Sequence, residues 1–133
     1  MTNTSSAPDM ANPANPANRA AELAADRKAA DIVVLDLRGR SSITDYFVVC
    51  TGRSDIQVRA ICERVREGMK DAGHGALSVE GAEHGHWGLL DFGEVVVHVF
   101  QSETRELYDL ERLWSDAPRW TYESAPAIEQ TSA

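Results

Sequence analysis

Three neighbouring side chains, Glu83, His84 and His86, could bind a metal ion and lie in a glycine-rich segment. A zinc site needs three or four ligands that converge at set spacings. No cysteine lies near this trio in the sequence, and no second pair of ligands follows at a suitable distance. The segment is therefore interpreted as a polar, flexible loop, and we expect neither a metal nor a cofactor.

Nucleophilic chemistry has no clearer signal. Cys50 and Cys62 lie in apolar stretches without an obvious base, which favours reduced, buried thiols. The sequence contains no glycine-rich phosphate loop and no Gly-x-Ser-x-Gly elbow. A hydroxyl-rich cluster precedes one apolar run, but its composition is more typical of a turn and strand entry: Ser41, Ser42, Thr44 and Asp45.

His98 stands alone among valines. If its segment is a strand, alternation places His98 on the same face as Val96 and Phe100. A lone histidine in such a position is more often structural or interfacial than catalytic.

The composition indicates one globular domain and an acidic surface. The chain has 133 residues, of which 43% are hydrophobic and 26% charged, and its net charge is −8. Binding to a phosphate backbone needs lysine and arginine, so direct nucleic-acid binding is not expected. A basic protein is the more suitable partner, because complementary charge speeds encounter. No apolar run is long enough for a membrane span, and no secretory signal is evident, so we expect a cytoplasmic protein.

Two polar segments flank the predicted domain. Residues 1–18 are rich in Asn, Pro, Ala, Ser and Thr and are predicted to be a disordered tail. Residues 119–133 are predicted to be a flexible C-terminal tail. The domain itself is expected to span residues 19–118.

The first half of the domain predicts helices and buried strands in alternation. Residues 19–30 form an alanine-rich helix that Asn18 could cap. Continuous apolar runs at 32–35 and 46–50 indicate strands covered on both faces. Ser54 and Gln57 have capping-box spacing and are expected to open a helix that ends near Gly73. This helix carries one apolar stripe, formed by Val58, Ile61, Cys62, Val65 and Met69.

The second half predicts strands followed by short helices. A short strand at 77–80 precedes a hairpin of strands 87–91 and 95–100, which turns at Gly93. Ser102 and Asp109 could each cap a short helix before Trp114. The fold class is therefore α/β, with about five strands in a mixed sheet flanked by helices.

This element order also suggests a nucleotidyltransferase-like fold. That chemistry needs two carboxylates one residue apart on a strand to hold Mg²⁺. The corresponding position here reads Asp36-Leu37-Arg38, and Asp91 and Glu94 straddle a turn instead. The sequence therefore predicts that the protein is not an enzyme.

Several motifs resemble one known family in the same order. They are Asp31 to Asp36, Ser41-Ser42-Ile43-Thr44-Asp45-Tyr46, Thr51-Gly52-Arg53-Ser54 with Gln57-Val58, Glu80-Gly81 before Trp87, Leu89 to Phe100, and Glu103 to Trp114. Together they resemble the ribosomal silencing factor family, also called Iojap, over roughly residues 20–118. The match is specific because many separated motifs agree.

The resemblance implies a fold and a function. It implies a nucleotidyltransferase-like fold without demonstrated transferase chemistry. It also implies a translational repressor that binds the large ribosomal subunit through its basic ribosomal protein fourteen and blocks joining with the small subunit, notably when nutrients are scarce. Family members often form homodimers when free. A role in large-subunit assembly, or less favourably an enzymatic role, stays open.

The partner-binding residues are expected near the most acidic segment. From Asp91 to Asp116 there are seven acids and two bases, a local charge of −5. Trp87 and Tyr108, which the resemblance matches to the family's interface, are predicted aromatic anchors, although core positions are the alternative. Leu110, Leu113 and Trp114 are predicted to pack. The full predicted set is Trp87, Leu89, Asp91, Glu94, His98, Glu103 and Tyr108.

Overall fold

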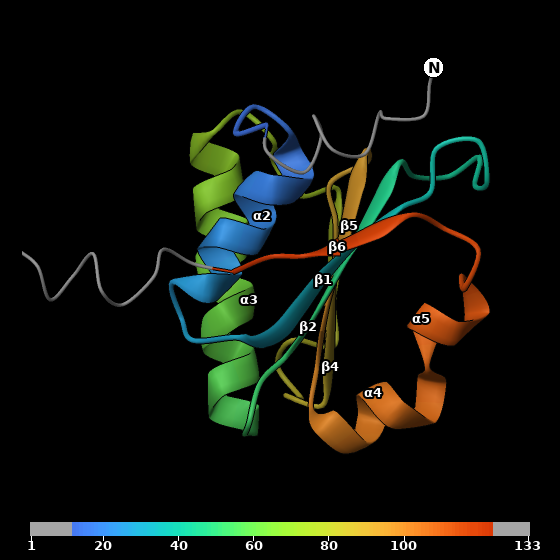
Figure 1. Cartoon of the computed structure of the whole chain (residues 1–133). Coiled ribbons are helices and arrows are strands. Elements are labelled where there is room, and N and C mark those ends of the chain that lie inside the picture. The colour runs from blue at the N-terminus through green and yellow to red at the C-terminus, as the bar shows by residue number, and fades with distance from the viewer. Residues whose placement is uncertain (1–11, 124–133) are drawn as a thin grey trace, which may run out of the picture.

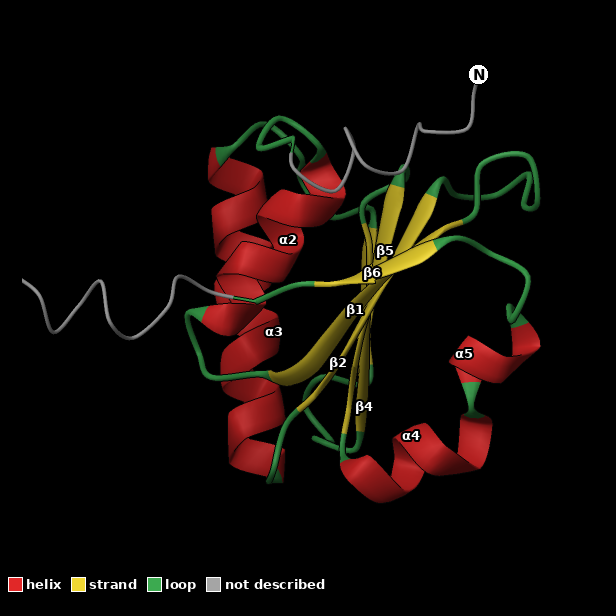
Figure 2. Ribbon diagram, viewed as in Figure 1, coloured by secondary structure: helices red, strands yellow, loops and turns green. Residues whose placement is uncertain are grey.

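The computed structural model describes residues 12–123, which form a six-stranded mixed sheet with helices on both faces (Figures 1 and 2). The predicted α/β class is confirmed, with one strand more than expected. The tail predictions for residues 1–11 and 124–133 lie outside the described residues. No helix within 12–123 is long and apolar enough to cross a membrane.

The sheet has the strand order β3-β4-β5-β2-β1-β6. Its central neighbours β2 and β5 are parallel, and the other four pairs of strands are antiparallel. The strands are β1 (Ala30–Asp36), β2 (Tyr46–Thr51), β3 (Ser78–Glu80), β4 (Trp87–Asp91), β5 (Val95–Phe100) and β6 (Arg119–Thr121).

Helices α2 (Pro16–Ala25) and α3 (Asp55–Asp71) cover one face of the sheet and enclose the main core (Figure 1). Ser54 is confirmed as the N-cap of α3, because its hydroxyl accepts a hydrogen bond from the Gln57 backbone N–H at 3.1 Å. The Gln57 side chain accepts a hydrogen bond from the Arg53 N–H at 2.6 Å, one residue before the donor that a capping box would use. All five residues of the predicted apolar stripe of α3 are buried. Both cysteines are free and buried.

The predicted start of the first helix is wrong. Helix α2 begins at Pro16, and Asn15, not Asn18, is its N-cap, with a side chain that accepts a hydrogen bond from the Ala17 N–H. Proline is favoured in the first turn of a helix because its fixed φ suits the helix and it needs no donor there. Asn18 lies inside α2, where its Oδ1 accepts a hydrogen bond from Trp120 Nε1 at 3.0 Å.

Strand β6 lies within the segment that was predicted to be a flexible tail. It pairs with β1 in antiparallel fashion, and Val34 faces Trp120. The Trp120 ring is buried and meets Tyr46 edge to face, with ring centroids 6.3 Å apart. These contacts extend the folded unit past residue 118.

The opposite face of the sheet carries two short helices, α4 (Ser102–Tyr108) and α5 (Leu110–Leu113). Gln101, not Ser102, holds the N-cap position of α4, and neither it nor Asp109 makes a side-chain capping bond. Trp114 packs against a second buried cluster with Leu35 and Leu37, as predicted. Leu113 is 72% exposed, so its predicted packing role is wrong.

Candidate partner-binding surface

The β4–β5 hairpin brings the predicted aromatic and apolar residues to one face of the sheet. Trp87 pairs with Phe100, and Leu89 pairs with His98. Side chains of directly opposed residues in an antiparallel pair lie on the same face, and alternate residues along one strand share that face. These four side chains therefore lie on the face that carries α4 and α5.

Five rings on this face form an aromatic cluster: Phe47, Trp87, His98, Phe100 and Tyr108. The Trp87 ring stacks on Phe100 at 4.9 Å between centroids and meets Tyr108 at 4.5 Å. Trp87 is half-buried, whereas Tyr108 is 51% exposed. Tyr108 is therefore a surface residue that rests on Trp87, and the alternative of a core position does not hold for it.

His98 is the buried member of the aromatic cluster. It is only 4% exposed and accepts a hydrogen bond at Nδ1 from Trp87 Nε1 at 3.2 Å. Burial lowers the pKa of His98 to about 4, so the imidazole is neutral at physiological pH. His98 was predicted to bind a partner, but the structure places it beneath the surface, behind Trp87.

The predicted acidic residues lie at two separate places. Asp91 is at the hairpin end of β4, where its Oδ1 accepts a hydrogen bond from the Gly93 N–H at 2.8 Å, and Glu94 is exposed beside it. Trp87 begins the same strand, so about 13 Å of extended chain separates Trp87 from Asp91. Glu103 is exposed on α4, close in sequence to Tyr108. The predicted set thus divides into an aromatic region and a hairpin region.

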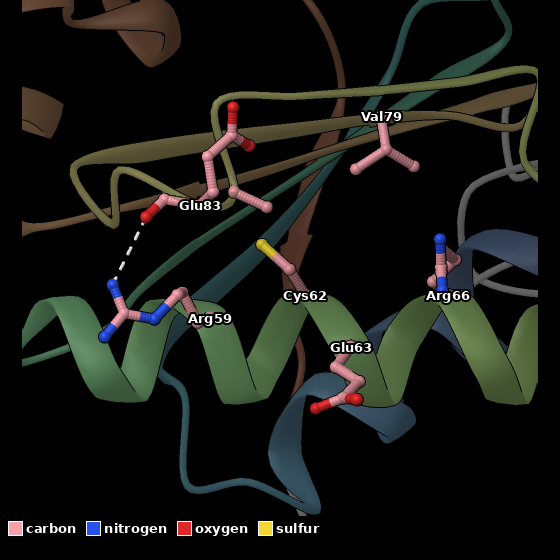
Figure 3. A pocket seen from close by; sticks show the side chains of 7 residues that line it. Arg59, Cys62, Glu63, Arg66, Val79 and Glu83 are labelled. Atoms are coloured by element: carbon pink, nitrogen blue, oxygen red, sulfur yellow. Dashed lines mark hydrogen bonds between the residues drawn. The ribbon is translucent and has the colours of Figure 1, made fainter.

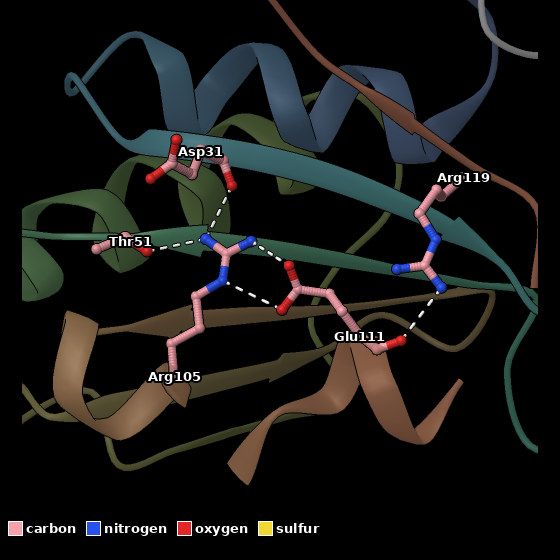
Figure 4. Close-up of polar contacts among 5 residues, drawn as sticks. All are labelled: Asp31, Thr51, Arg105, Glu111 and Arg119. Carbon is pink, nitrogen blue, oxygen red and sulfur yellow. Dashed lines mark hydrogen bonds and ion pairs between the residues drawn. The ribbon is translucent and has the colours of Figure 1, made fainter. Parts of the chain in front are cut away.

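Arg105 fastens α4 and α5 to the sheet (Figure 4). Its guanidinium donates to Glu111 Oε2 at 2.8 Å, to Thr51 Oγ1 at 2.8 Å and to the Asp31 carbonyl at 2.8 Å. The same ion pair holds the pKa of Glu111 below its ordinary value. These contacts therefore hold α4, and with it its last residue Tyr108, in a defined position on the sheet.

Two exposed leucines on α4 and α5 were not predicted as surface residues. Leu107 is 77% exposed on α4 and Leu113 is 72% exposed on α5. Leucines at helical spacing are usually predicted to pack against the core. Their exposure here could not be read from the sequence, because it depends on how the two short helices lie on the sheet. Exposed large apolar side chains on the two helices of this face make it suitable for protein contact.

The position where a transferase would need its metal is occupied by an ion pair. Arg38 Nη2 lies 2.7 Å from Asp36 Oδ2. Burial alone would raise the pKa of Asp36, but the hydrogen bonds and the charge of Arg38 outweigh it and lower that pKa. Among residues 12–123, no three His, Cys, Asp or Glu side chains are grouped to hold a metal ion.

A hollow of about 300 Å³ lies on the other side of the molecule, between α3 and the β3–β4 connection (Figure 3). Arg59 Nη1 donates to the Glu83 carbonyl at 3.3 Å across it. Cys62 points into the hollow, and burial raises the pKa of its thiol to about 12, so it is no nucleophile at neutral pH. This hollow therefore offers no evident chemistry.

Comparisons with known proteins agree with the earlier resemblance. A family model described as "Ribosomal silencing factor during starvation" matches residues 10–133. The ribosomal silencing factor RsfS of Bacillus subtilis (strain 168) is 44% identical over 93 residues, which cover 70% of this chain and 79% of the relative. The chain belongs to the ribosomal silencing factor family. The resemblance predicted from the sequence is therefore confirmed.

Two further similar proteins extend the comparison. A crystal structure of a protein from Chromobacterium violaceum has a TM-score of 0.74 at 36% identity and covers 84% of this chain and 89% of its own. The mouse protein named "Mitochondrial assembly of ribosomal large subunit protein 1" is 33% identical over 90 residues, covering 65% of this chain and 40% of the relative. The solved structure shares this fold, and the names of the relatives refer to ribosomal silencing and to assembly of the large ribosomal subunit.

Proposed function

We propose that this ribosomal silencing factor binds the large ribosomal subunit in the cytoplasm through its basic ribosomal protein fourteen and blocks joining with the small subunit. The observation that carries the proposal is the exposed Tyr108 in contact with Trp87, with exposed Leu107 on the same helix and exposed Leu113 on the next one. A rigid aromatic anchor among apolar and acidic neighbours suits the centre of a protein interface.

Charge supports a basic partner. Residues 91–116 carry a net charge of −5 out of −8 for the whole chain. Glu103 and Glu106 are exposed on α4, next to Tyr108. Acidic groups around an aromatic anchor favour a basic protein surface and disfavour a phosphate backbone. Occlusion of the subunit face needs binding alone, without turnover or cofactor.

A role in large-subunit assembly is the second candidate, and the name of the mouse relative supports it. Both roles use the same contact with the large subunit. A nucleotidyltransferase role has little support, because Arg38 forms an ion pair with Asp36 and stands at the sequence position where a second carboxylate is needed. Incubation with labelled nucleotide triphosphates and Mg²⁺ is expected to give no incorporation.

The test is sucrose-gradient sedimentation of purified ribosomal subunits with the wild-type protein and with Tyr108→Ala. We expect the wild type to co-migrate with large subunits and to increase the free-subunit fraction. Tyr108→Ala is expected to weaken binding by about 2 kcal/mol, roughly 30-fold, because an exposed anchor contributes more to binding than to folding.

The matched control is Ile56→Ala. Ile56 is 69% exposed on α3, on the other side of the sheet, so its loss changes exposed apolar area away from the candidate surface. Circular dichroism checks that both variants are folded. A folded Tyr108→Ala protein that binds as tightly as Ile56→Ala would refute the anchor, and a wild type that neither co-migrates nor separates subunits would refute the function.

A further inference from the structure

The indole of Trp87 has one polar atom, and His98 binds it. Trp87 Nε1 donates to His98 Nδ1 at 3.2 Å between the paired strands β4 and β5, where the two residues are diagonal neighbours because Trp87 faces Phe100 and His98 faces Leu89. The two ring centroids are 6.0 Å apart with planes tilted by 34°. A hydrogen bond to the ring edge and stacking on Phe100 together fix both the position and the rotation of the indole.

His98 is held as an acceptor at this place. Because Nδ1 accepts, the proton of the neutral ring is on Nε2. Nε2 is buried and has no hydrogen-bond partner among residues 12–123. The Phe47 ring lies edge to face with the imidazole at 4.5 Å. A phenylalanine could fill this apolar site without an unpaired donor, so the distinctive contribution of the imidazole is the bond to Trp87.

We propose that His98 is a positioning residue, which fixes the Trp87 indole so that Trp87 in turn holds Tyr108 in its exposed orientation. Tyr108 lies 4.5 Å from Trp87, whereas His98 itself is buried. His98 thus acts on the partner through two rings in series and does not touch it. The link to binding rests on the proposed function, but the link between the rings does not.

The first experiment follows the indole N–H signals of the ¹⁵N-labelled protein by NMR, with Trp87→Phe to assign the Trp87 signal. In His98→Phe, which keeps a stacked ring but removes the acceptor, we expect the Trp87 signal to shift and its hydrogen exchange to become about tenfold faster. His98→Asn, which can offer an amide oxygen near the place of Nδ1, is expected to restore part of the protection. An unchanged Trp87 signal in His98→Phe would overturn the proposal.

The second experiment measures binding to purified large subunits in a double-mutant cycle. We expect His98→Phe to weaken binding about five- to tenfold in the wild-type background and to have no further effect in the Trp87→Phe background. A merely structural role would lower binding equally in both backgrounds and would contradict the proposal. If the wild-type protein does not bind large subunits, the proposed function fails, while the indole signal still decides the role of His98.

Discussion

At the scale of single residues, buried His98 makes the stability of this protein depend on pH. The pKa of His98 is lowered from 6.5 to about 4 by burial. Between these two values the unfolded chain binds a proton that the folded chain does not, so stability falls as the pH falls. Above pH 6.5 His98 is neutral in both states and costs no stability. We expect the free energy of unfolding to fall by roughly 2 kcal/mol by pH 4.5.

Urea denaturation at pH 7 and pH 4.5 measures this loss, and His98→Phe is the control. Asp36 and Glu111, whose pKa values are lowered, are present in both proteins, so their contributions cancel in the comparison. We expect the wild type to lose more stability than the variant over this range. Parallel losses in the two proteins would show that His98 titrates normally.

At the scale of elements, the attachment of α4 and α5 depends on one planar side chain. Arg105 is 12% exposed and contacts α5, β2 and the residue Asp31 at once. An ammonium group cannot reproduce a guanidinium that bonds a carboxylate through two nitrogens. We therefore expect Arg105→Lys to lower the free energy of unfolding by about 1–2 kcal/mol and to weaken large-subunit binding through misplacement of Tyr108.

Arg112→Lys is the matched control, because Arg112 is exposed on α5. Its effect on urea denaturation should stay within about 0.5 kcal/mol. Equal midpoints for the two lysine variants would mean that the Arg105 contacts do not stabilise the docked helices.

Elements with strong local signals were predictable from the sequence, and elements that depend on distant partners were not. The apolar runs of β1, β2 and β5 and the stripe of α3 identified them directly. Strand β6 is three residues long and exists because Trp120 finds Asn18 and Tyr46, which lie far away in the chain. Pro16 was a local signal for the start of α2 that went unused.

The candidate site divides in the same way. Alternation along β5 correctly placed His98 on the face of Phe100, because that depends only on strand periodicity. Its burial could not be predicted, since the covering rings of Trp87 and Phe47 come from two other strands. Asp91 and Glu94 are separated from Tyr108 because they lie at the turn of the β4–β5 hairpin, whereas Trp87, which contacts Tyr108, lies at its open end.

At the scale of the whole molecule, acidic residues concentrated in 91–116 predict salt-sensitive association. Raising the salt concentration from about 0.05 to 0.5 M should lower the rate constant for association with large ribosomal subunits about tenfold or more. The dissociation rate constant should change little, because screening acts on the approach of the partners. Glu103→Gln/Glu106→Gln should reduce the rate at low salt and flatten its salt dependence in stopped-flow measurements.

The control makes the same change of charge on α3, which lies on the opposite face of the sheet. Glu63 and Glu67 are exposed on α3, across the sheet from α4. Glu63→Gln/Glu67→Gln should leave most of the salt dependence intact. An equal effect of both pairs would indicate steering by total charge and not by the face that carries Tyr108.

The pairing of β1 with β6 sets an order of events during synthesis. Strand β1 leaves the ribosome early, but its edge stays open until β6 follows, and β2 likewise waits for β5. A nascent chain folds from its N-terminus as it emerges, so most of the apolar face of β1 and β2 is made before its neighbours exist. Residues 102–113, which include Tyr108, lie between β5 and β6 in the chain. They are therefore translated before the last strand, β6, can join the sheet.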